Sequence, residues 1–179
     1  SAPGRGNIWA RIEGGDKPAL VLLHHSDVVP VNEKYWDFDP FSGEIKGGYI
    51  LGRGALDMKG TGISHLANFI NLHRQGKKLN RDVIFIGAAD EESGGNFGVG
   101  WLVKNHPEIF EGAGLLLNEG GSGYKSNDSI VFSVEITQKV PVWLRLTAID
   151  TPGHGSSPRS TSSVSRVVKA LNIIWNNPF

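Results

Sequence analysis

Three short apolar runs, each followed by histidine or acidic side chains, constrain the fold of this sequence more than any other feature. The runs ALVLLHH, DVIFIGAA and GLLL occupy residues 19–25, 82–89 and 114–117. Continuous apolar runs of this length, closed by Gly or acidic residues, are typical of buried strands. The sequence therefore predicts three strands buried within a sheet.

Helical periodicity separates these runs. Between the first two, apolar side chains recur with the spacing i, i+3, i+4 and i+7 at Ile63, Leu66, Ala67 and Ile70. This spacing predicts a helix over residues 58–75, and Gly76 suits its end. A shorter helix is predicted over residues 97–105, before Pro107. The alternation of strands and helices predicts an α/β fold, with a mostly parallel sheet flanked by helices.

The pattern changes after about Ser133. Residues 142–149 (VWLRLTAI) predict a longer strand, and an amphipathic helix is predicted over residues 164–174. One strand and one helix are too few to bury their apolar faces and form an independent domain. We therefore expect a first domain over residues 1–134 and the incomplete beginning of a smaller α+β domain over residues 135–179.

Charge and composition exclude several classes of protein. The 179 residues carry 18 basic and 18 acidic side chains, so no basic surface indicates a nucleic-acid or anionic-membrane partner. No apolar run approaches the 18 residues that span a bilayer. No targeting segment is visible, and the sequence does not indicate in which cellular compartment the protein works. Because the chain has no Cys, a metal site must use His and carboxylate ligands.

Polar side chains follow each predicted strand at the point where the strand ends. His25 and Asp27 follow the first strand, Asp90, Glu91 and Glu92 the second, and Glu119 the third, while Asp57 precedes the first helix. In open α/β sheets, ligands bind at the carboxyl ends of the strands. We therefore expect these side chains to converge on one edge of the sheet.

Each of these residues also has an ordinary interpretation. His25 could be a surface loop residue, although an acid two positions away can orient a metal-bound imidazole. Asp57 could cap the helix, which does not exclude a ligand role. Adjacent acids usually form a solvated loop, but at a sheet edge they repel one another, and a divalent cation removes the conflict. His154, in a Gly-rich turn, is either a loop residue or a positioned hydrogen-bond donor.

Six motifs in order carry a resemblance to a known family. They are HSDVVP (25–30), WDFDPFSG (36–43), GRGALDMKG (52–60), DEESGG (90–95), NEGG (118–121) and GHGSSP (153–158). Together they resemble the two-zinc metallopeptidases and amidohydrolases that include aminoacylase, glutamate carboxypeptidase, carnosinase and succinyl-diaminopimelate desuccinylase. The resemblance covers nearly the whole chain.

The resemblance implies two Zn²⁺ ions, with Co²⁺ or Mn²⁺ as alternatives. It implies that His25 and Glu119 bind one ion, that Glu92 binds the other, and that Asp57 bridges both. It further implies that Asp27 orients His25. The alternative for such an acidic cluster is a structural Ca²⁺ or Mg²⁺ site, but the histidine favours a transition metal.

The resemblance also assigns catalytic roles. Glu91 is implied to be the general base that takes a proton from an activated water and passes it to the leaving amine. His154 is implied to belong to a lid and dimerisation domain, and in a homodimer to reach the partner's site and stabilise the substrate oxyanion. Residues 1–134 then form the N-terminal part of a catalytic domain.

One departure concerns the last metal ligand. The family uses a further His, late in the sequence, to complete the zinc site that Glu92 serves, and no His follows His154. We therefore expect the chain to be a fragment, inactive in isolation, of a protein that forms a homodimer.

The expected function is zinc-dependent hydrolysis of amide bonds in N-acyl amino acids or short peptides. A carbamoyl-type amidohydrolase on the same fold is an alternative. A non-catalytic relative that acts as a binding or assembly module is another, although it would be expected to have lost Glu91 or a ligand.

Overall fold

A four-stranded sheet organises the first part of the chain. The computed structural model describes residues 1–137, 139, 142–157 and 159–177, which divide into two units, Ser1–Val134 and Glu135–Phe179. The sheet contains, in spatial order, β1 (Ile8–Ile12), β5 (Arg81–Ala88), β2 (Lys17–His25) and β6 (Ala113–Leu117). β2 pairs in parallel with β5 and β6, and β1 pairs antiparallel with β5. The predicted α/β class and mostly parallel sheet are confirmed.

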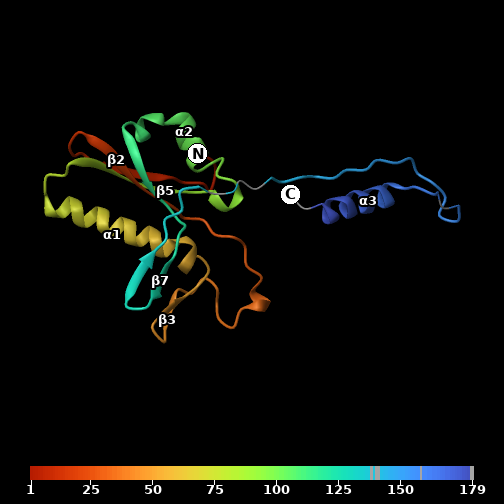
Figure 1. The fold of residues 1–179 in the computed structure, drawn as a ribbon, viewed down its shortest axis with the longest axis horizontal. Coiled ribbons are helices and arrows are strands. Elements are labelled where there is room, and N and C mark those ends of the chain that lie inside the picture. Colours follow the sequence, from red (N-terminus) through yellow and green to blue (C-terminus); the bar gives the residue numbers. More distant parts are fainter. Residues whose placement is uncertain (138, 140–141, 158, 178–179) are drawn as a thin grey trace. The chain divides into compact units, whose positions relative to one another are not determined.

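Two helices cover opposite faces of this sheet (Figure 1). α1 (Gly60–Gln75) contributes Phe69 to the face that carries Leu22, Val83 and Phe85. α2 (Val99–Asn105) contributes Leu102 to the other face, against Val21, Ile84 and Ile86. Alternate residues of β5 therefore serve the two faces, which explains why its sequence is continuously apolar. α1 ends where Gly76 adopts a left-handed conformation with φ 59°, as the sequence predicts.

The third predicted strand is only half covered. β6 lies at the edge of the sheet, and Leu115, Leu116 and Leu117 remain 52%, 58% and 51% exposed. The expectation that this strand is buried is therefore wrong for the chain as described. The strand is exposed because the core clusters under α1 and α2 are formed by side chains of β2 and β5, not of β6.

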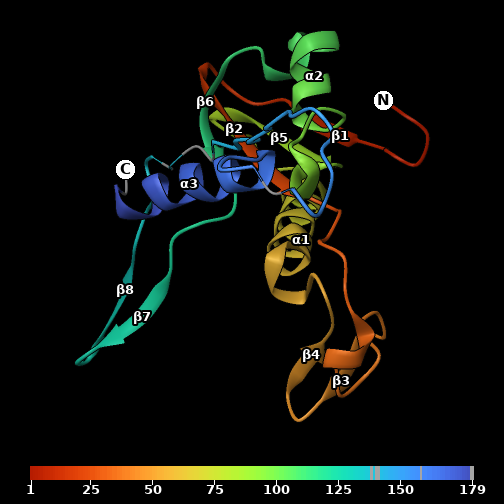
Figure 2. The same ribbon diagram turned by 90° about the vertical axis from the view of Figure 1, so that its right-hand side faces the viewer.

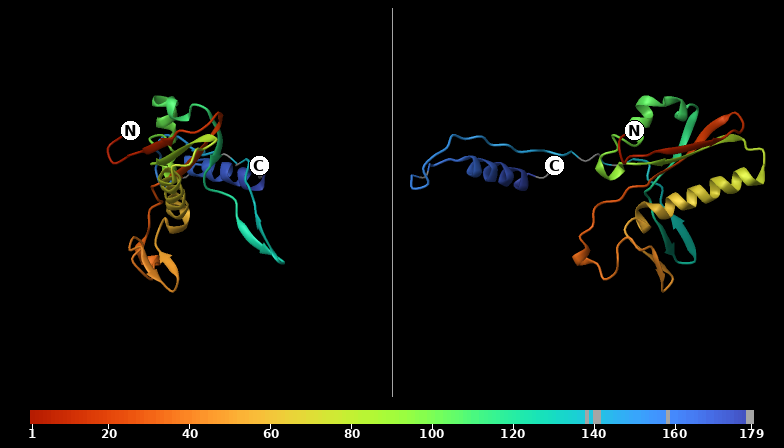
Figure 3. Two further views of the ribbon diagram at one scale, coloured as in Figure 1. Left: turned by 90° about the vertical axis from the view of Figure 1, so that its left-hand side faces the viewer. Right: turned by 180° about the vertical axis from the view of Figure 1, so that it is seen from behind.

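Short elements project from or connect this sheet (Figures 2 and 3). Two hairpins are formed by β3 (Glu44–Lys46) with β4 (Tyr49–Leu51) and by β7 (Gly123–Ser126) with β8 (Ser129–Phe132). The connections include η1 (Glu33–Tyr35), η2 (Ala55–Lys59), η3 (Glu91–Ser93) and η4 (Pro107–Phe110). η2 and η3 matter most, because they carry candidate site residues.

In the described part of the second unit lies the helix α3 (Ser163–Asn176), which begins with a reciprocal capping pair between Ser162 and Ser165. The predicted helix is therefore present. The strand predicted over residues 142–149 is not formed, since these residues have no regular structure. A strand needs a neighbour for its backbone hydrogen bonds, and the described part of this unit offers none. Pro158 of the GHGSSP motif lies outside the described residues.

Within the part of the chain that the structure describes, no helix combines the length and the apolar character needed to cross a bilayer.

An ion pair between β1 and the start of β5 leads to a pH prediction. Arg11 donates to Asp82 at 2.6 Å, and this bond, with one from the Gly14 N–H, lowers the pKa of Asp82 below its ordinary 3.8. A lowered carboxyl pKa stabilises the fold above about pH 3.8 and stops doing so as pH falls through the folded value. Asp82→Asn should therefore unfold at lower urea concentration near neutral pH, with a difference from wild type that shrinks in acid. A difference that stays constant throughout the acid range would contradict this origin.

Candidate metal centre

The carboxyl ends of three parallel strands place the candidate residues. β2 ends at His25, which pairs in register with Ala88 at the end of β5. On the other side, Leu22 of β2 pairs with Leu117 at the end of β6. The residues that follow β5 and β6 therefore emerge at the same edge as His25. Glu91 and Glu119 reach it from these two directions.

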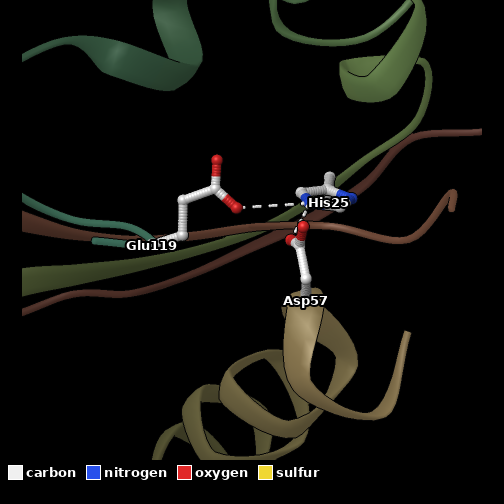
Figure 4. A group of neighbouring side chains, drawn as sticks. All are labelled: His25, Asp57 and Glu119. Carbon is white, nitrogen blue, oxygen red and sulfur yellow. Dashed lines mark hydrogen bonds and ion pairs between the residues drawn. The ribbon is translucent and has the colours of Figure 1, made fainter. Parts of the chain in front are cut away.

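His25 lies at the centre of the group and is 3% exposed. Its Nε2 lies 3.1 Å from Asp57 Oδ1 and 3.3 Å from Glu119 Oε2 (Figure 4). A third carboxylate oxygen, Glu91 Oε2, is 3.9 Å from the same nitrogen. Ligand atoms of His25, Asp57 and Glu119 all lie within 4.8 Å of one another, which suits one metal ion. Imidazole and carboxylate donors are those that zinc accepts.

The tautomer of His25 follows from its second nitrogen. Nδ1 lies 2.9 Å from the backbone carbonyl of Asp27, which can only accept, so Nδ1 carries the proton. In the neutral imidazole Nε2 then presents its lone pair to Asp57 and Glu119. A backbone carbonyl is a common partner for the distal nitrogen of a metal-bound His.

The charges around this nitrogen are unbalanced without a cation. Burial lowers the pKa of His25, but the Asp27 carbonyl and the Asp57 and Glu119 carboxylates outweigh it and raise the pKa above its ordinary value. Burial, followed by the nearby Glu91 carboxylate, raises the pKa of Glu119. A divalent cation would replace the proton on His25 and relieve the repulsion between the acids. The donor set therefore fits a metal ion.

Asp27 contacts this group in a way that the sequence does not reveal. Its carboxylate is 3.6 Å from His25 Nδ1 and accepts hydrogen bonds from the backbone N–H groups of Glu91 and Glu92, at 3.1 and 3.2 Å. The shorter contact with His25 comes from the Asp27 carbonyl. The same residue therefore contacts both the imidazole and the backbone that carries two acidic candidates.

Asp57 is directed at His25 rather than at a helix end. It lies in η2, after Gly54, whose φ of 83° favours glycine, and the residue that caps α1 is Lys59, without a side-chain capping bond. The Lys59 ammonium donates instead to the Ser26 carbonyl. The helix-cap interpretation of Asp57 is therefore wrong.

Glu91 and Glu92 occupy different positions in η3. The Glu91 side chain is 48% exposed and lines a small hollow of about 120 Å³ that it shares with His25 and Asn118. That volume has room for a few water molecules. Glu92 is half-buried, and within the described residues its carboxylate is not part of the ligand group that surrounds His25.

Three further histidines, His24, His65 and His154, are not part of the ligand group around His25. His154 lies in the second unit, exposed, with Nδ1 2.7 Å from Ser156 Oγ. His24 packs on Phe85, with ring centroids 5.1 Å apart. His65 of α1 is half-buried with Nδ1 shielded from solvent, because it lies one turn before Phe69, on the side of the helix that packs on the sheet.

A mostly parallel sheet with a histidine and carboxylates at its carboxyl edge defines an α/β protein with a candidate metal centre. The chain belongs to peptidase family M20/M25/M40, whose family model matches residues 21–172. The family resemblance drawn from the six motifs is thereby confirmed.

Known relatives agree with this assignment. The chain is 35% identical to aminoacylase-1 of Sus scrofa over 157 residues, which cover 87% of this chain and 38% of the relative. It is 34% identical to the probable carboxypeptidase S-like 2 of Dictyostelium discoideum, covering 95% of this chain and 34% of the relative. The metallo-carboxypeptidase Sso-CP2 of Sulfolobus solfataricus matches 64% of this chain and 26% of its own, with TM-score 0.54 and 30% identity. The chain thus spans less than two fifths of these curated relatives.

Proposed function

We propose that the protein is a zinc-dependent hydrolase that cleaves the amide bond of N-acyl amino acids or short peptides. The observation that carries this proposal is the group of His25, Asp57 and Glu119 ligand atoms within 4.8 Å at the carboxyl edge of the sheet. Membership of the M20/M25/M40 family supports a metallopeptidase-type reaction. Relatives named aminoacylase and carboxypeptidase support small acylated or peptide substrates.

In this proposal His25, Asp57 and Glu119 would hold one ion, and Glu92 together with Asp57 would hold a second. Bound cations would supply Lewis acidity that acidifies a water molecule and polarises the substrate carbonyl. The Nδ1 bond of His25 to the Asp27 carbonyl keeps Nε2 free as a ligand. The half-buried position of Glu92 and its backbone bond to Asp27 are compatible with a ligand role.

Glu91 is the proposed general base. Its carboxylate faces the hollow beside His25 and remains accessible to water. From there it can take a proton from the attacking water and deliver the proton to the leaving amine nitrogen. The bonds of Asp27 to the η3 backbone would keep this carboxylate close to the metal ligands.

We further propose that residues 1–134 form part of the catalytic domain and residues 135–179 part of a lid and dimerisation domain. In a homodimer, His154 would reach the partner's site and donate to the substrate oxyanion. The capping of α3 and the Gly-rich turn around His154 are compatible with this assignment.

The test is a substrate panel on the full-length protein. N-acetyl amino acids and dipeptides should be hydrolysed, N-carbamoyl amino acids should be poor substrates, and a chelator should remove nearly all turnover until Zn²⁺, Co²⁺ or Mn²⁺ is restored. Preference for the N-carbamoyl compounds would favour the carbamoyl-type alternative. Turnover that survives complete removal of metal would overturn the proposal.

A further inference from the structure

The loop that carries Glu91 and Glu92 is bound along its length by residues far away in the sequence. This acidic loop comprises residues 89–97. The N-terminal strap, residues 1–7, contacts it from a separation of more than 80 residues. We propose that Arg5 and Asn7 are positioning residues that hold the acidic loop in the geometry Glu91 needs as general base. This inference rests on the proposed function for the role of Glu91.

Asn7 joins the two ends of the acidic loop. Its Oδ1 accepts from the Ala89 N–H at 2.9 Å, and its Nδ2 donates to the Phe97 carbonyl at 3.0 Å. A single side-chain amide therefore ties together the residue that enters the loop and the residue that leaves it. This contact fixes the width of the loop at its base.

Arg5 acts on the residue next to the proposed base. Its Nε donates to Asp90 Oδ1 at 3.1 Å, and the Asp90 side chain is 5% exposed. The other carboxylate oxygen accepts from the Phe97 N–H at 3.0 Å. Asp90 adopts φ 68°, a left-handed conformation that costs free energy for a residue other than glycine. These bonds hold Asp90 in that conformation, which turns the chain so that Glu91 follows toward His25.

This arrangement corrects one expectation from the sequence. The three adjacent acids Asp90, Glu91 and Glu92 were expected to share the metal edge. Asp90 instead pairs with Arg5 and accepts from the Phe97 N–H, and among the described residues it is not part of the ligand group around His25. The repulsion among the acids is thus partly relieved by a cationic side chain rather than by metal alone.

The β1 register explains why the strap arrives at this place. β1 pairs antiparallel with β5, with Ile8 opposite Gly87, so the residues before Ile8 run past the end of β5. Asn7 and Arg5 therefore reach the loop that follows β5. Within the loop, the Asp27 carboxylate accepts from the Glu91 and Glu92 N–H groups. The backbone of both acids lies between two sets of hydrogen bonds.

The chain offers a matched control for the strap. Arg11 of β1 forms an ion pair with Asp82, at the opposite end of β5 from Asp90. Arg5→Ala and Arg11→Ala each remove one Arg–Asp pair between the N-terminal region and the ends of the same strand. They differ in whether the pair touches the acidic loop.

The experiment measures amide hydrogen exchange and steady-state kinetics on the metal-loaded full-length protein. Arg5→Ala and Asn7→Ala should raise exchange within residues 89–97 and lower kcat by about 10–100-fold with little change in KM, because a displacement of about 1 Å can cost that much. Arg5→Lys, which keeps the charge, should restore part of kcat. Arg11→Ala should leave loop exchange and kcat within about twofold of wild type. This change is much smaller than the loss of about 10–100-fold expected for the strap variants.

The outcomes separate this inference from the proposed function. Unchanged loop exchange in both strap variants would show that the strap does not hold the loop. Faster exchange with unchanged kcat would overturn the positioning role, as would equal loss of kcat in Arg11→Ala. A wild-type protein without amidase turnover would instead overturn the proposed function, whatever the exchange shows.

Discussion

Glu91→Gln is expected to lower kcat of the full-length protein by about 10²–10⁴-fold, the range that general acid–base groups contribute. Gln has nearly the same size, so the contacts of the acidic loop with Asp27 and the N-terminal strap should persist. Glutamine cannot accept a proton from water at neutral pH. Because Glu91 is assigned no metal, the variant should keep the wild-type metal content, measured by elemental analysis.

A matched substitution elsewhere controls for the loss of one carboxylate. Glu44, exposed on β3, lies outside the ligand group and carries no assigned role. Glu44→Gln should keep kcat within about twofold of wild type, since surface substitutions of this kind have small effects. If Glu91→Gln also kept its turnover, Glu91 would not be the base. If it lost metal together with turnover, the carboxylate would be a ligand instead.

His25→Ala should remove metal binding as well as turnover. Its Nε2 is the nitrogen donor nearest both Asp57 and Glu119, and the variant leaves these acids without the ligand between them. Losing a partner that only orients a metal ligand already costs 10–100-fold in metal affinity, so loss of the ligand itself should cost at least about 100-fold. Titration with Zn²⁺ or Co²⁺ under a competing chelator measures this change.

The control for this variant is a histidine on the same unit. His73 lies exposed near the end of α1, and His73→Ala should bind metal as wild type does. Equal affinities for His25→Ala and wild type would place the metal elsewhere. Equal losses in both variants would indicate weak, general binding by histidines rather than a centre at the sheet edge.

Much of the fold could be predicted because strong local patterns agree with the tertiary structure. The apolar runs of β2 and β5 are long enough to be buried on both faces, and the helical spacing before Gly76 predicts the extent of α1. It does not predict which side of α1 is buried, because Ile63 and Ile70 are exposed and Phe69 packs on the sheet. β6 shows the limit of this reasoning, because an apolar run does not reveal whether a helix lies over it. The strand predicted over residues 142–149 fails for a related reason, since no local pattern supplies a pairing partner.

The candidate site likewise has contacts that the sequence predicts and contacts that it does not. The convergence of His25 and Glu119 follows from where parallel strands end, and sequence alone predicts it. The dual contact of Asp27 and the pairing of Asp90 with Arg5 depend on a backbone conformation and on the register of β1. The spacing of two predicts the contact of Asp27 with His25, but no spacing encodes the bonds of Asp27 to Glu91 and Glu92 or of Asp90 to Arg5, because these residues lie more than 60 positions apart.

Anomalous diffraction at the zinc edge, from crystals of the full-length protein grown with Zn²⁺, would locate the metal ions themselves. We expect a strong peak within about 2.0–2.2 Å of His25 Nε2 and of carboxylate oxygens of Asp57 and Glu119, with a second peak that shares Asp57 and contacts Glu92. Zinc peaks located only away from this edge of the sheet, or none in a protein that still hydrolyses amides, would contradict it.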